Sequence, residues 1–226
     1  ELGTKLEKLR LVRNGVDTVQ RQRERTVVIL REKLGILESP TIISIRNFKP
    51  VYNVEMLIRA IPLVLKQVPE AKFIITGDGE QKDYLTDLAN SLGILDNIEF
   101  IGWIPHDQLP KYLASSDVYV STSLSDSSPL SLQEAMACEL APVVTDIPAN
   151  HAWIEDGRNG FIVPVNDTQM LADRIVHLIS NRQLRNRFGK ANRGIIQEKA
   201  EYEAEMAKME KVYEELRKGL EIDNAY

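Results

Sequence analysis

Residues 117–146 read DVYVSTSLSD (117–126) followed by SSPLSLQEAMACELAPVVTD (127–146), and they predict a strand, a helix and a second strand. The flanking runs DVYVS (117–121) and PVVTD (142–146) are short and rich in β-branched residues, and residues 129–138 between them have a helical pattern. The apolar residues of both runs are consecutive, which is typical of strands covered on both faces in a parallel sheet. The stretch therefore predicts one strand–helix–strand unit.

The same alternation continues along most of the chain. Further helices are expected near 80–92, 107–115 and 167–180, between short β-branched runs. Such alternation predicts an α/β fold, a doubly wound Rossmann-like parallel sheet with helices on both faces and ligands at the carboxyl ends of the strands. The other expected strands are LRLV (9–12), TIISI (41–45), KFIITG (72–77), IEFIG (98–102) and FIVP (161–164).

One more helix is expected after residue 53. Its apolar residues follow the 3.6-residue period of a helix, and Asn53 is a suitable N-cap. Pro62 falls inside this pattern, where it is expected to kink or locally open the helix. The apolar positions are Val54, Leu57, Ile58, Ile61, Leu65 and Val68.

The two ends of the chain differ from its middle. Residues 1–40 are expected to form a connector, a leading strand and a charged helix, residues 41–198 the Rossmann-like domain, and residues 199–226 a C-terminal helix and tail. The last helix carries an apolar stripe that we expect to pack on the flank of the domain itself; docking onto something outside the chain is the alternative. The stripe consists of Tyr202, Met206, Met209, Tyr213 and Leu216, spaced 4, 3, 4 and 3 residues apart.

The composition is that of a soluble globular protein. The chain has 226 residues, 43% hydrophobic and 27% charged, and its net charge of −5 argues against nucleic acid as the main partner. No apolar stretch approaches the ~18–20 residues of a transmembrane segment, and no signal peptide opens the chain. The single cysteine, Cys138, fits a reducing compartment. We expect a cytoplasmic protein, peripheral at most to the inner face of the membrane.

Neither zinc nor thiol chemistry is favoured. His106, His151 and His177 lack the spacing of zinc ligands. Cys138, inside AMAC, is expected to be a buried apolar residue rather than a nucleophile. A nicotinamide-binding domain is also disfavoured, because RNFKP (46–50) contains no glycine for a G-x-G-x-x-G turn.

Two acids flank the start of the helix expected at 129–138. Ser128 is a suitable N-cap, and Pro129 suits the first helical position. A helix start carries unpaired N–H groups and about half a positive charge, so it favours phosphate. Glu134 lies six residues past the cap, about 9 Å along the axis at ~1.5 Å per residue, and Asp126 lies before the cap.

This layout suits one extended ligand. With a diphosphate at the helix start, Glu134 would accept hydrogen bonds from hydroxyls on one side and Asp126 from hydroxyls on the other. A nucleoside diphosphate sugar has this order of groups: ribose, two phosphates, hexose. The alternative is that Glu134 is a solvated helix residue and Asp126 a loop acid, and the residues alone favour neither.

The segment from Asp126 through SSPLSLQEAMACELAPVVTD (127–146) resembles the carboxylate–seven–carboxylate signature of the retaining glycosyltransferases of family 4, the glycosyl transferases group 1, which have the GT-B fold. The resemblance runs over about residues 8–215 and covers the C-terminal, donor-binding half of that two-domain fold. It implies an N-terminal, acceptor-binding half that is not in this chain. The other matching motifs are NGVD (14–17), SIRNFKP (44–50), ITGDGE (75–80), IEFIGWIP (98–105) and IEDGRNGFIVPVND (154–167).

The resemblance implies a role for each matching position. Glu134 stands where the second acid of the signature binds the ribose hydroxyls, and Asp126 where the first acid, usually glutamate, contacts hydroxyls of the transferred sugar. Arg46 matches the arginine that binds the donor diphosphate and stabilises the leaving group, so Arg46 and Asp126 are the implied catalytic residues. Donor contacts are also implied for Lys49, Gly77, Trp103, Ile104, Ser128, Leu130 and Ser131, with Trp103 and Ile104 in the segment whose backbone meets the nucleobase.

Some of these positions have simpler explanations or depart from the family pattern. Gly77 fits a plain tight turn equally well, and Trp103 fits a core residue in an edge turn. The family usually places a lysine near the position of Tyr52, so either Lys49 supplies the second cation or Tyr52 donates one neutral hydrogen bond. Glu139 replaces a usual glycine, which is expected to affect only the helix cap.

The resemblance implies transfer of a sugar, of hexosyl type, from a UDP- or GDP-linked donor to an unknown acceptor, with retention of configuration. No Asp-x-Asp sequence occurs, so no metal and no further cofactor are expected. The expected partners are the nucleotide sugar and the N-terminal half of the same enzyme, without which this part should bind donor but not turn over. The alternatives are a non-catalytic nucleotide-sugar binding module, or a sugar-nucleotide epimerase or phosphorylase of the GT-B fold.

Overall fold

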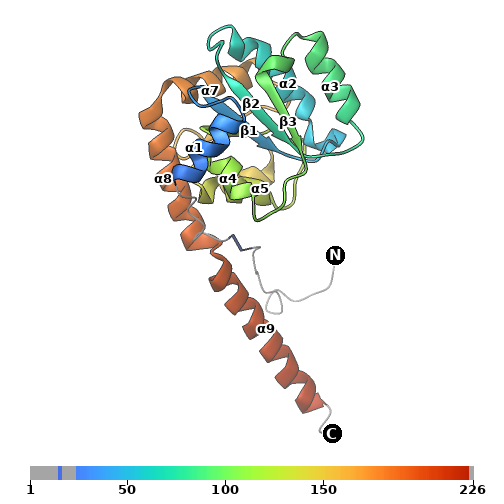
Figure 1. Cartoon of the computed structure of the whole chain (residues 1–226). Coiled ribbons are helices and arrows are strands. Elements are labelled where there is room, and N and C mark those ends of the chain that lie inside the picture. Colours follow the sequence, from blue (N-terminus) through green and yellow to red (C-terminus); the bar gives the residue numbers. More distant parts are fainter. Residues whose placement is uncertain (1–14, 17–23, 224–226) are drawn as a thin grey trace.

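The computed structural model describes residues 15–16 and 24–223 and contains one six-stranded sheet (Figure 1). All neighbouring strands are parallel, in the order β3-β2-β1-β4-β5-β6. This confirms the predicted α/β fold class and six of the predicted strands; the strand expected at 9–12 lies outside the described residues. The strands are β1 Thr41–Ile45, β2 Lys72–Thr76, β3 Ile98–Gly102, β4 Val118–Ser121, β5 Ala141–Thr145 and β6 Phe161–Val163.

Helices cover both faces of the sheet. Successive residues of β1 point to opposite sides, since Ile42 belongs to the core beneath α2, α3 and α7, and Ile43 to the core beneath α4, α5 and α8. Both faces are therefore buried, which explains the consecutive apolar residues of the strands. The α-helices are α1 Glu24–Lys33, α2 Val54–Leu65, α3 Lys82–Ser91, α4 Leu109–Ala114, α5 Leu130–Ala137, α6 Pro148–His151, α7 Thr168–Ser180, α8 Arg182–Lys199 and α9 Tyr202–Asp223; η2 Pro50–Tyr52 and η3 Leu95–Asn97 are 3-10 helices.

The chain reverses its direction across the sheet between β1 and β4. From β1 it builds outward to β2 and β3, and then returns to the other side of β1 with β4. In open α/β sheets the crevice at the carboxyl ends of two such strands is the usual place for a ligand. Here these ends are Ile45 and Ser121, followed by Arg46 and by the loop that leads to α5.

The helix expected after residue 53 is α2. Asn53 occupies the predicted N-cap position, although its side chain makes no capping hydrogen bond. Instead the Asn53 amide donates to Oδ1 of Asn166 over 3.0 Å, which ties the start of α2 to the loop before α7. Pro62 does not end the helix, which continues to Leu65.

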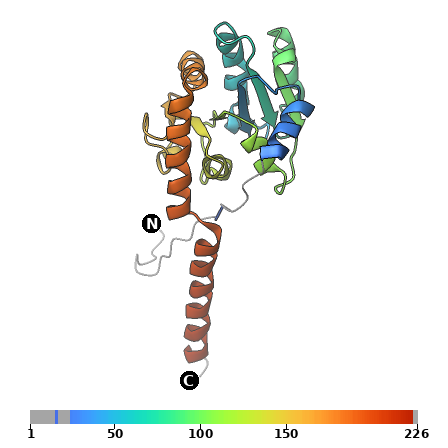
Figure 2. The ribbon, with the colours of Figure 1, turned by 60° about the vertical axis from the view of Figure 1, so that its left-hand side comes forward.

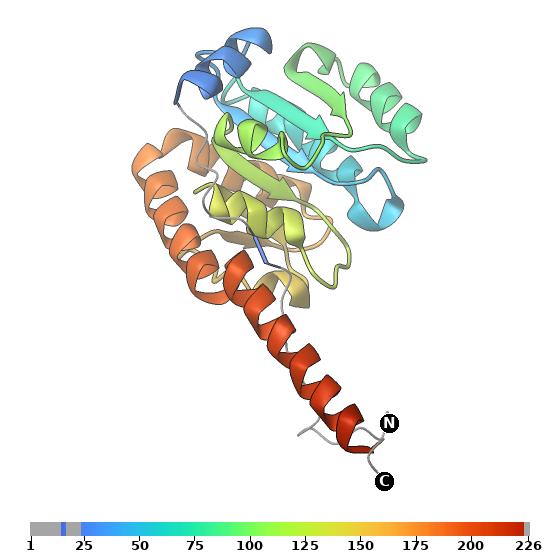
Figure 3. The same cartoon turned by 60° about the horizontal axis from the view of Figure 1, so that its bottom comes forward.

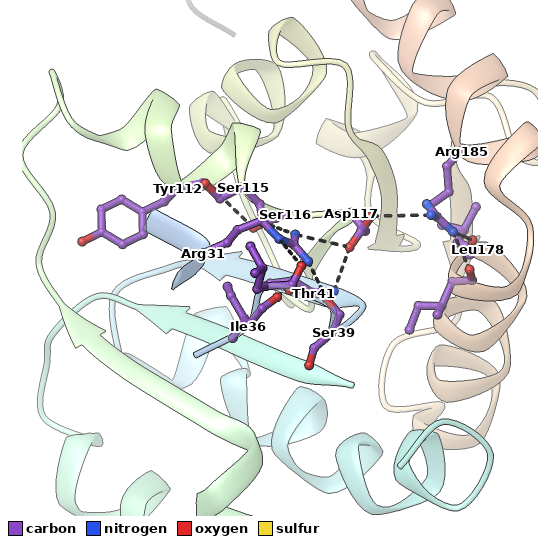
Figure 4. A network of polar contacts seen from close by, with 12 residues as sticks. Arg31, Ile36, Ser39, Thr41, Tyr112, Ser115, Ser116, Asp117, Leu178 and Arg185 are labelled. Atoms are coloured by element: carbon purple, nitrogen blue, oxygen red, sulfur yellow. Dashed lines mark hydrogen bonds and ion pairs between the residues drawn. The ribbon is translucent and has the colours of Figure 1, made fainter. Parts of the chain in front are cut away.

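The opposite, amino-terminal edge of the sheet is held by a polar network around Asp117 (Figure 4). Its Oδ2 accepts a hydrogen bond from the Thr41 N–H at 2.9 Å, and its carboxylate lies 3.8 Å from Arg31 and 3.5 Å from Arg185. Arg31 also donates to the carbonyl oxygens of Ser115 and Ser39. The network joins α1 and α8 to β1 and β4 at the end of the sheet away from the crevice.

The last helix leaves the domain. After α8, α9 extends away from the sheet in every view (Figure 1, Figure 2 and Figure 3). Tyr202, Tyr213 and Leu216 of the apolar stripe are 49%, 65% and 60% exposed, so the expectation that the stripe packs on the flank of the domain is wrong. The periodicity predicts the helix correctly, but a stripe does not say which surface covers it. Among the described residues no helix combines the length and apolar character needed to cross a membrane.

Candidate functional site

A cavity of about 290 Å³ lies at the carboxyl ends of β1, β2 and β3. It brings together five residues that the sequence implies in donor binding, namely Arg46, Gly77, Trp103, Ile104 and Glu134. The loops after three strands therefore converge with α5, which contributes Glu134, at the edge where the fold predicts a ligand. The remaining lining residues are Ile45, Asn47, Tyr52, Thr76, His106 and Leu109.

Three contacts fix the Arg46 side chain at this cavity. Its Nε donates to Oγ of Ser121 over 3.0 Å, and its Nη1 forms an ion pair with Oδ2 of Asp126 at 3.1 Å. The guanidinium carbon also lies 5.5 Å from the ring centroid of Tyr52, within the range of a cation–π interaction. The third nitrogen, Nη2, is buried and has no hydrogen-bond partner among the described residues. A buried donor without a partner is unfavourable, so this nitrogen suits an incoming anion.

Asp126 organises the loop before α5 in addition to pairing with Arg46. Its Oδ1 accepts a hydrogen bond from the Ser128 N–H at 3.0 Å, a turn that aspartate commonly forms with the backbone two residues on. The predicted cap is therefore wrong: α5 begins at Leu130, Pro129 takes the N-cap position, and no side chain caps the helix. Asp126 itself does not line the cavity and reaches the site through Arg46.

The three residues implied at the start of α5 do not line the cavity. Ser128 and Leu130 are exposed. Ser131 is buried, and its Oγ lies 2.9 Å from the hydroxyl of Tyr119 in β4. Its side chain thus holds α5 against the sheet, and a ligand contact by Ser131 would involve its backbone.

Glu134 pairs with a residue that the sequence did not indicate. Oε1 of Glu134 lies 3.2 Å from Nδ1 of His106, and the two side chains are 12% and 82% exposed. Burial raises the pKa of the Glu134 carboxyl, and the His106 charge acts in the opposite direction. From the sequence, His106 is recognisable only as a histidine without zinc-ligand spacing. Its pairing with Glu134 could not be recognised, because the two residues are 28 positions apart.

Gly77 positions Arg46. Its φ of +138° lies in the region that favours glycine, and a Cβ at this position would be 2.0 Å from the carbonyl oxygen of Arg46. The loop after β2 is therefore packed directly against the backbone that carries the guanidinium. Glycine is required here because position 77 packs closely against the backbone of Arg46 in the same chain.

The other implied contacts separate into buried and exposed positions. Trp103 is 73% exposed at the cavity, so it is not a core residue, whereas Ile104 is 9% exposed and belongs to the core beneath α4 and α5. Lys49 is exposed and does not line the cavity, while Tyr52 does. Among the described residues that line the cavity, Arg46 is the only lysine or arginine.

Comparison with known proteins agrees with this arrangement. Residues 28–194 match the family described as glycosyl transferases group 1. The chain belongs to this family. It is 30% identical over 191 residues to N-acetyl-alpha-D-glucosaminyl L-malate synthase of Bacillus anthracis, covering 84% of this chain and 49% of the synthase. The chain thus spans about half the length of that relative.

Solved structures show the same fold. S. aureus TarM, in a structure with fondaparinux, alpha-GlcNAc-glycerol and UDP, has a TM-score of 0.72 and 28% identity, over 77% of this chain and 35% of TarM. Anabaena HepE, in complex with UDP-glucose, has a TM-score of 0.85 and 22% identity, over 94% of this chain and 59% of HepE. These neighbours are GT-B glycosyltransferases, and the sheet described here corresponds to one half of the GT-B fold.

The described part of the chain contains no group of three or more His, Cys, Asp or Glu residues that could hold a metal ion. Cys138, at the end of α5, has its thiol pKa raised to about 12, mainly by burial. A thiol in that state is a poor nucleophile, because the thiolate is the reactive form.

Proposed function

We propose that this chain is the donor-binding part of a glycosyltransferase that moves a sugar from a nucleoside diphosphate sugar to an acceptor, with retention of configuration and without a metal ion. The observation that carries the proposal is that Arg46 and Glu134 line one cavity at the carboxyl ends of the strands. A fixed guanidinium suits a diphosphate, and a carboxylate suits paired hydroxyls. UDP in the TarM structure and UDP-glucose in the HepE structure support this class of ligand.

Arg46 would bind the diphosphate. Asp126, Ser121 and Tyr52 already fix its orientation, and the buried Nη2 offers a donor to a phosphate oxygen. A donor fixed before the reaction stabilises the negative charge that develops on the leaving diphosphate as the glycosidic bond breaks. The start of α5 would add the partial positive charge of its helix dipole.

The two acids would act on different parts of the donor. Glu134 would accept hydrogen bonds from the ribose hydroxyls. Asp126 stands at the position of the acid that contacts the transferred hexose, but it does not line the cavity, so it would act through Arg46, whose guanidinium it holds. Tyr52, close to the family's lysine position, would offer a neutral hydrogen bond to the diphosphate, since Lys49 does not line the cavity.

The rest of the reaction would depend on chain outside these residues. The acceptor and its binding groups would belong to an N-terminal half of the same enzyme, because the chain spans about half of its relatives. We propose a UDP- or GDP-linked hexose as donor, no further cofactor, and a cytoplasmic location that includes the inner face of a membrane.

Calorimetric titration of the 226-residue chain with UDP, GDP, UDP-glucose and GDP-mannose tests donor binding. At least one of these ligands is expected to bind, and Arg46→Ala is expected to weaken that binding by about tenfold or more, the loss of one charge-assisted hydrogen bond or more. Arg59→Ala is the matched control, because Arg59 forms an exposed pair with Glu55 on α2, outside the cavity. Absence of binding by every ligand, or equal binding by both variants, would refute the proposal.

A non-catalytic nucleotide-sugar binding module is the second candidate. It is favoured by Tyr52 near the position where the family usually has a lysine, which leaves Arg46 as the only lysine or arginine among the described cavity residues. A two-domain protein that contains this half decides between the two. Large losses of transfer rate in Arg46→Ala and Glu134→Ala indicate an enzyme, whereas binding without any transfer indicates a module.

A further inference from the structure

His106 is placed at the donor cavity by the loop between β3 and α4. Its imidazole Nδ1 lies 3.2 Å from Oε1 of Glu134, and both residues line the cavity. The two side chains come from different segments, one after β3 and the other in the second turn of α5. The contact therefore joins two segments that are 28 residues apart in the sequence.

The exposure of the two side chains is unequal, and this indicates which one depends on the other. Glu134 is 12% exposed, and a carboxylate so deeply buried favours its neutral form unless a partner compensates the lost hydration. Among the described residues, His106 is the only side chain that hydrogen-bonds or pairs with the Glu134 carboxylate. Arg46, the other charged group of the cavity, is paired with Asp126, and Cys138, one turn along α5, carries a thiol that stays neutral at physiological pH.

His106 in turn contributes little to the fold. Its side chain is 82% exposed, so removing it uncovers almost no buried surface. Its backbone carbonyl accepts from the Leu109 N–H at the start of α4, and a side-chain substitution leaves this bond in place. The contact to Glu134 is thus the one interaction of the imidazole with the described residues that a substitution removes.

We propose that His106 is a positioning residue for Glu134, holding the carboxylate ionised and oriented toward the cavity so that it can accept hydrogen bonds from the ribose hydroxyls of the donor. This inference rests on the proposed function, because it needs a nucleotide in the cavity. An ionised carboxylate has acceptor positions on both oxygens, so pairing at Oε1 leaves Oε2 for the ligand. His106 itself would not contact the reacting atoms.

The test compares UDP with 2′,3′-dideoxy-UDP, by calorimetry on the 226-residue chain, because only UDP offers the ribose hydroxyls. If GDP binds more tightly, GDP and its dideoxy analogue take their place. The natural nucleotide is expected to bind more tightly than its dideoxy analogue. His106→Ala is expected to weaken binding of the natural nucleotide by about fivefold, which corresponds to the loss of one modest charge-assisted interaction. Binding of the dideoxy analogue is expected to stay unchanged.

Three further variants separate positioning from general damage. His106→Asn is expected to restore most of the affinity, because its amide nitrogen can take the place of Nδ1 and donate to Oε1. His151→Ala is the matched control, since His151 pairs with Asp146 at 2.7 Å outside this cavity, and should change nothing. In a Glu134→Gln background, His106→Ala is expected to cause no further loss, because its effect acts through the carboxylate.

The outcomes distinguish this inference from the proposed function. If neither nucleotide binds the unmodified chain, the proposed function fails and the inference fails with it. If the natural nucleotide binds but His106→Ala retains the full preference over the dideoxy analogue, the inference alone is overturned. An equal loss for both nucleotides would also overturn it, because that would show a general effect on the cavity.

Discussion

Nη1 of Arg46 lies 3.1 Å from Oδ2 of Asp126, and the two side chains are 9% and 11% exposed. This buried ion pair connects the end of β1 to the loop after β4, across the point where the chain reverses direction in the sheet. Asp126 also fixes the turn before α5 through the Ser128 N–H. One carboxylate thus positions both the guanidinium and the approach to the helix.

Asp126→Asn is expected to destabilise the chain markedly. The substitution keeps the shape of the side chain but leaves the Arg46 charge buried without a counter-ion, which in comparable pairs costs about 3 kcal/mol in the free energy of unfolding. Added UDP should stabilise the variant more than it stabilises the unmodified chain, because the diphosphate would then replace the lost charge. Chemical denaturation with and without UDP measures both effects.

The control for this substitution is Glu55→Gln. Glu55 pairs with Arg59 at 2.7 Å, but the two side chains are 33% and 47% exposed. An exposed pair contributes little, so a loss below about 0.5 kcal/mol is expected. If Asp126→Asn were as mild as Glu55→Gln, the buried ion pair would not be a stabilising element of the site.

Gly77→Ala is expected to displace the backbone of Arg46. The new Cβ would lie 2.0 Å from the Arg46 carbonyl oxygen, so the backbone must move, and the φ of +138° adds strain. We expect a loss of about 3 kcal/mol or more in the free energy of unfolding, together with weaker UDP binding.

Gly93→Ala separates the effect of backbone strain from that of a steric clash. Gly93 has a φ of +68°, but a Cβ added there would meet nothing within 4 Å, so only the backbone cost of about 1–2 kcal/mol applies. UDP affinity should stay unchanged in this variant. Equal effects of the two alanine substitutions on UDP affinity would contradict the view that Gly77 positions Arg46.

Much of the fold could be predicted from the sequence, because local signals and tertiary structure agree. The runs around Ile42 and Val143 are consecutive apolar residues, and the structure covers both faces of these strands. The convergence of Arg46 and Glu134 was also predictable, since Arg46 follows β1 and the helix that carries Glu134 starts after β4, both at the carboxyl ends of parallel strands. The division of the chain at residues 41 and 199 stays a prediction, as do the functional roles of the individual side chains.

Three of the differences from the sequence predictions involve polar contacts that helix propensity does not include. Asn53 takes the N-cap position of α2, but its side chain bonds to Asn166, 113 positions away, and makes no capping hydrogen bond. Ser128 gives its N–H to Asp126, and α5 starts later as a result. His106 pairs with Glu134 without any sequence pattern that links them. Propensity rules describe a residue and its neighbours, so they cannot include the contacts of Asn53 and His106, whereas the Asp126 turn is a local competitor of the helix start.

Asp117→Ala is expected to reduce stability without changing nucleotide binding. Asp117 lies at the amino-terminal edge of the sheet, where it accepts from the Thr41 N–H and faces Arg31 and Arg185 (Figure 4). Loss of this charged acceptor should lower the free energy of unfolding by about 2 kcal/mol. Asp173→Ala, on the exposed side of α7, should change it by less than about 0.5 kcal/mol. An altered UDP affinity in Asp117→Ala would show that the two edges of the sheet are coupled.

Glu134→Gln is expected to stabilise the free chain while weakening nucleotide binding. Burial raises the folded-state pKa of Glu134 above its unfolded value, so the folded chain holds the proton more tightly than the unfolded chain does. As the pH rises from the unfolded pKa through the raised folded pKa, the contribution of this carboxyl to the free energy of unfolding therefore falls. Above both pKa values the ionised Glu134 is a net cost, so a neutral glutamine should raise the free energy of unfolding. The advantage should shrink as the pH falls through the folded pKa, because the glutamate is then neutral as well. Denaturation curves from pH 4 to pH 8 measure the difference, and a glutamine variant that is less stable at neutral pH would show that the His106 pair outweighs the burial of Glu134.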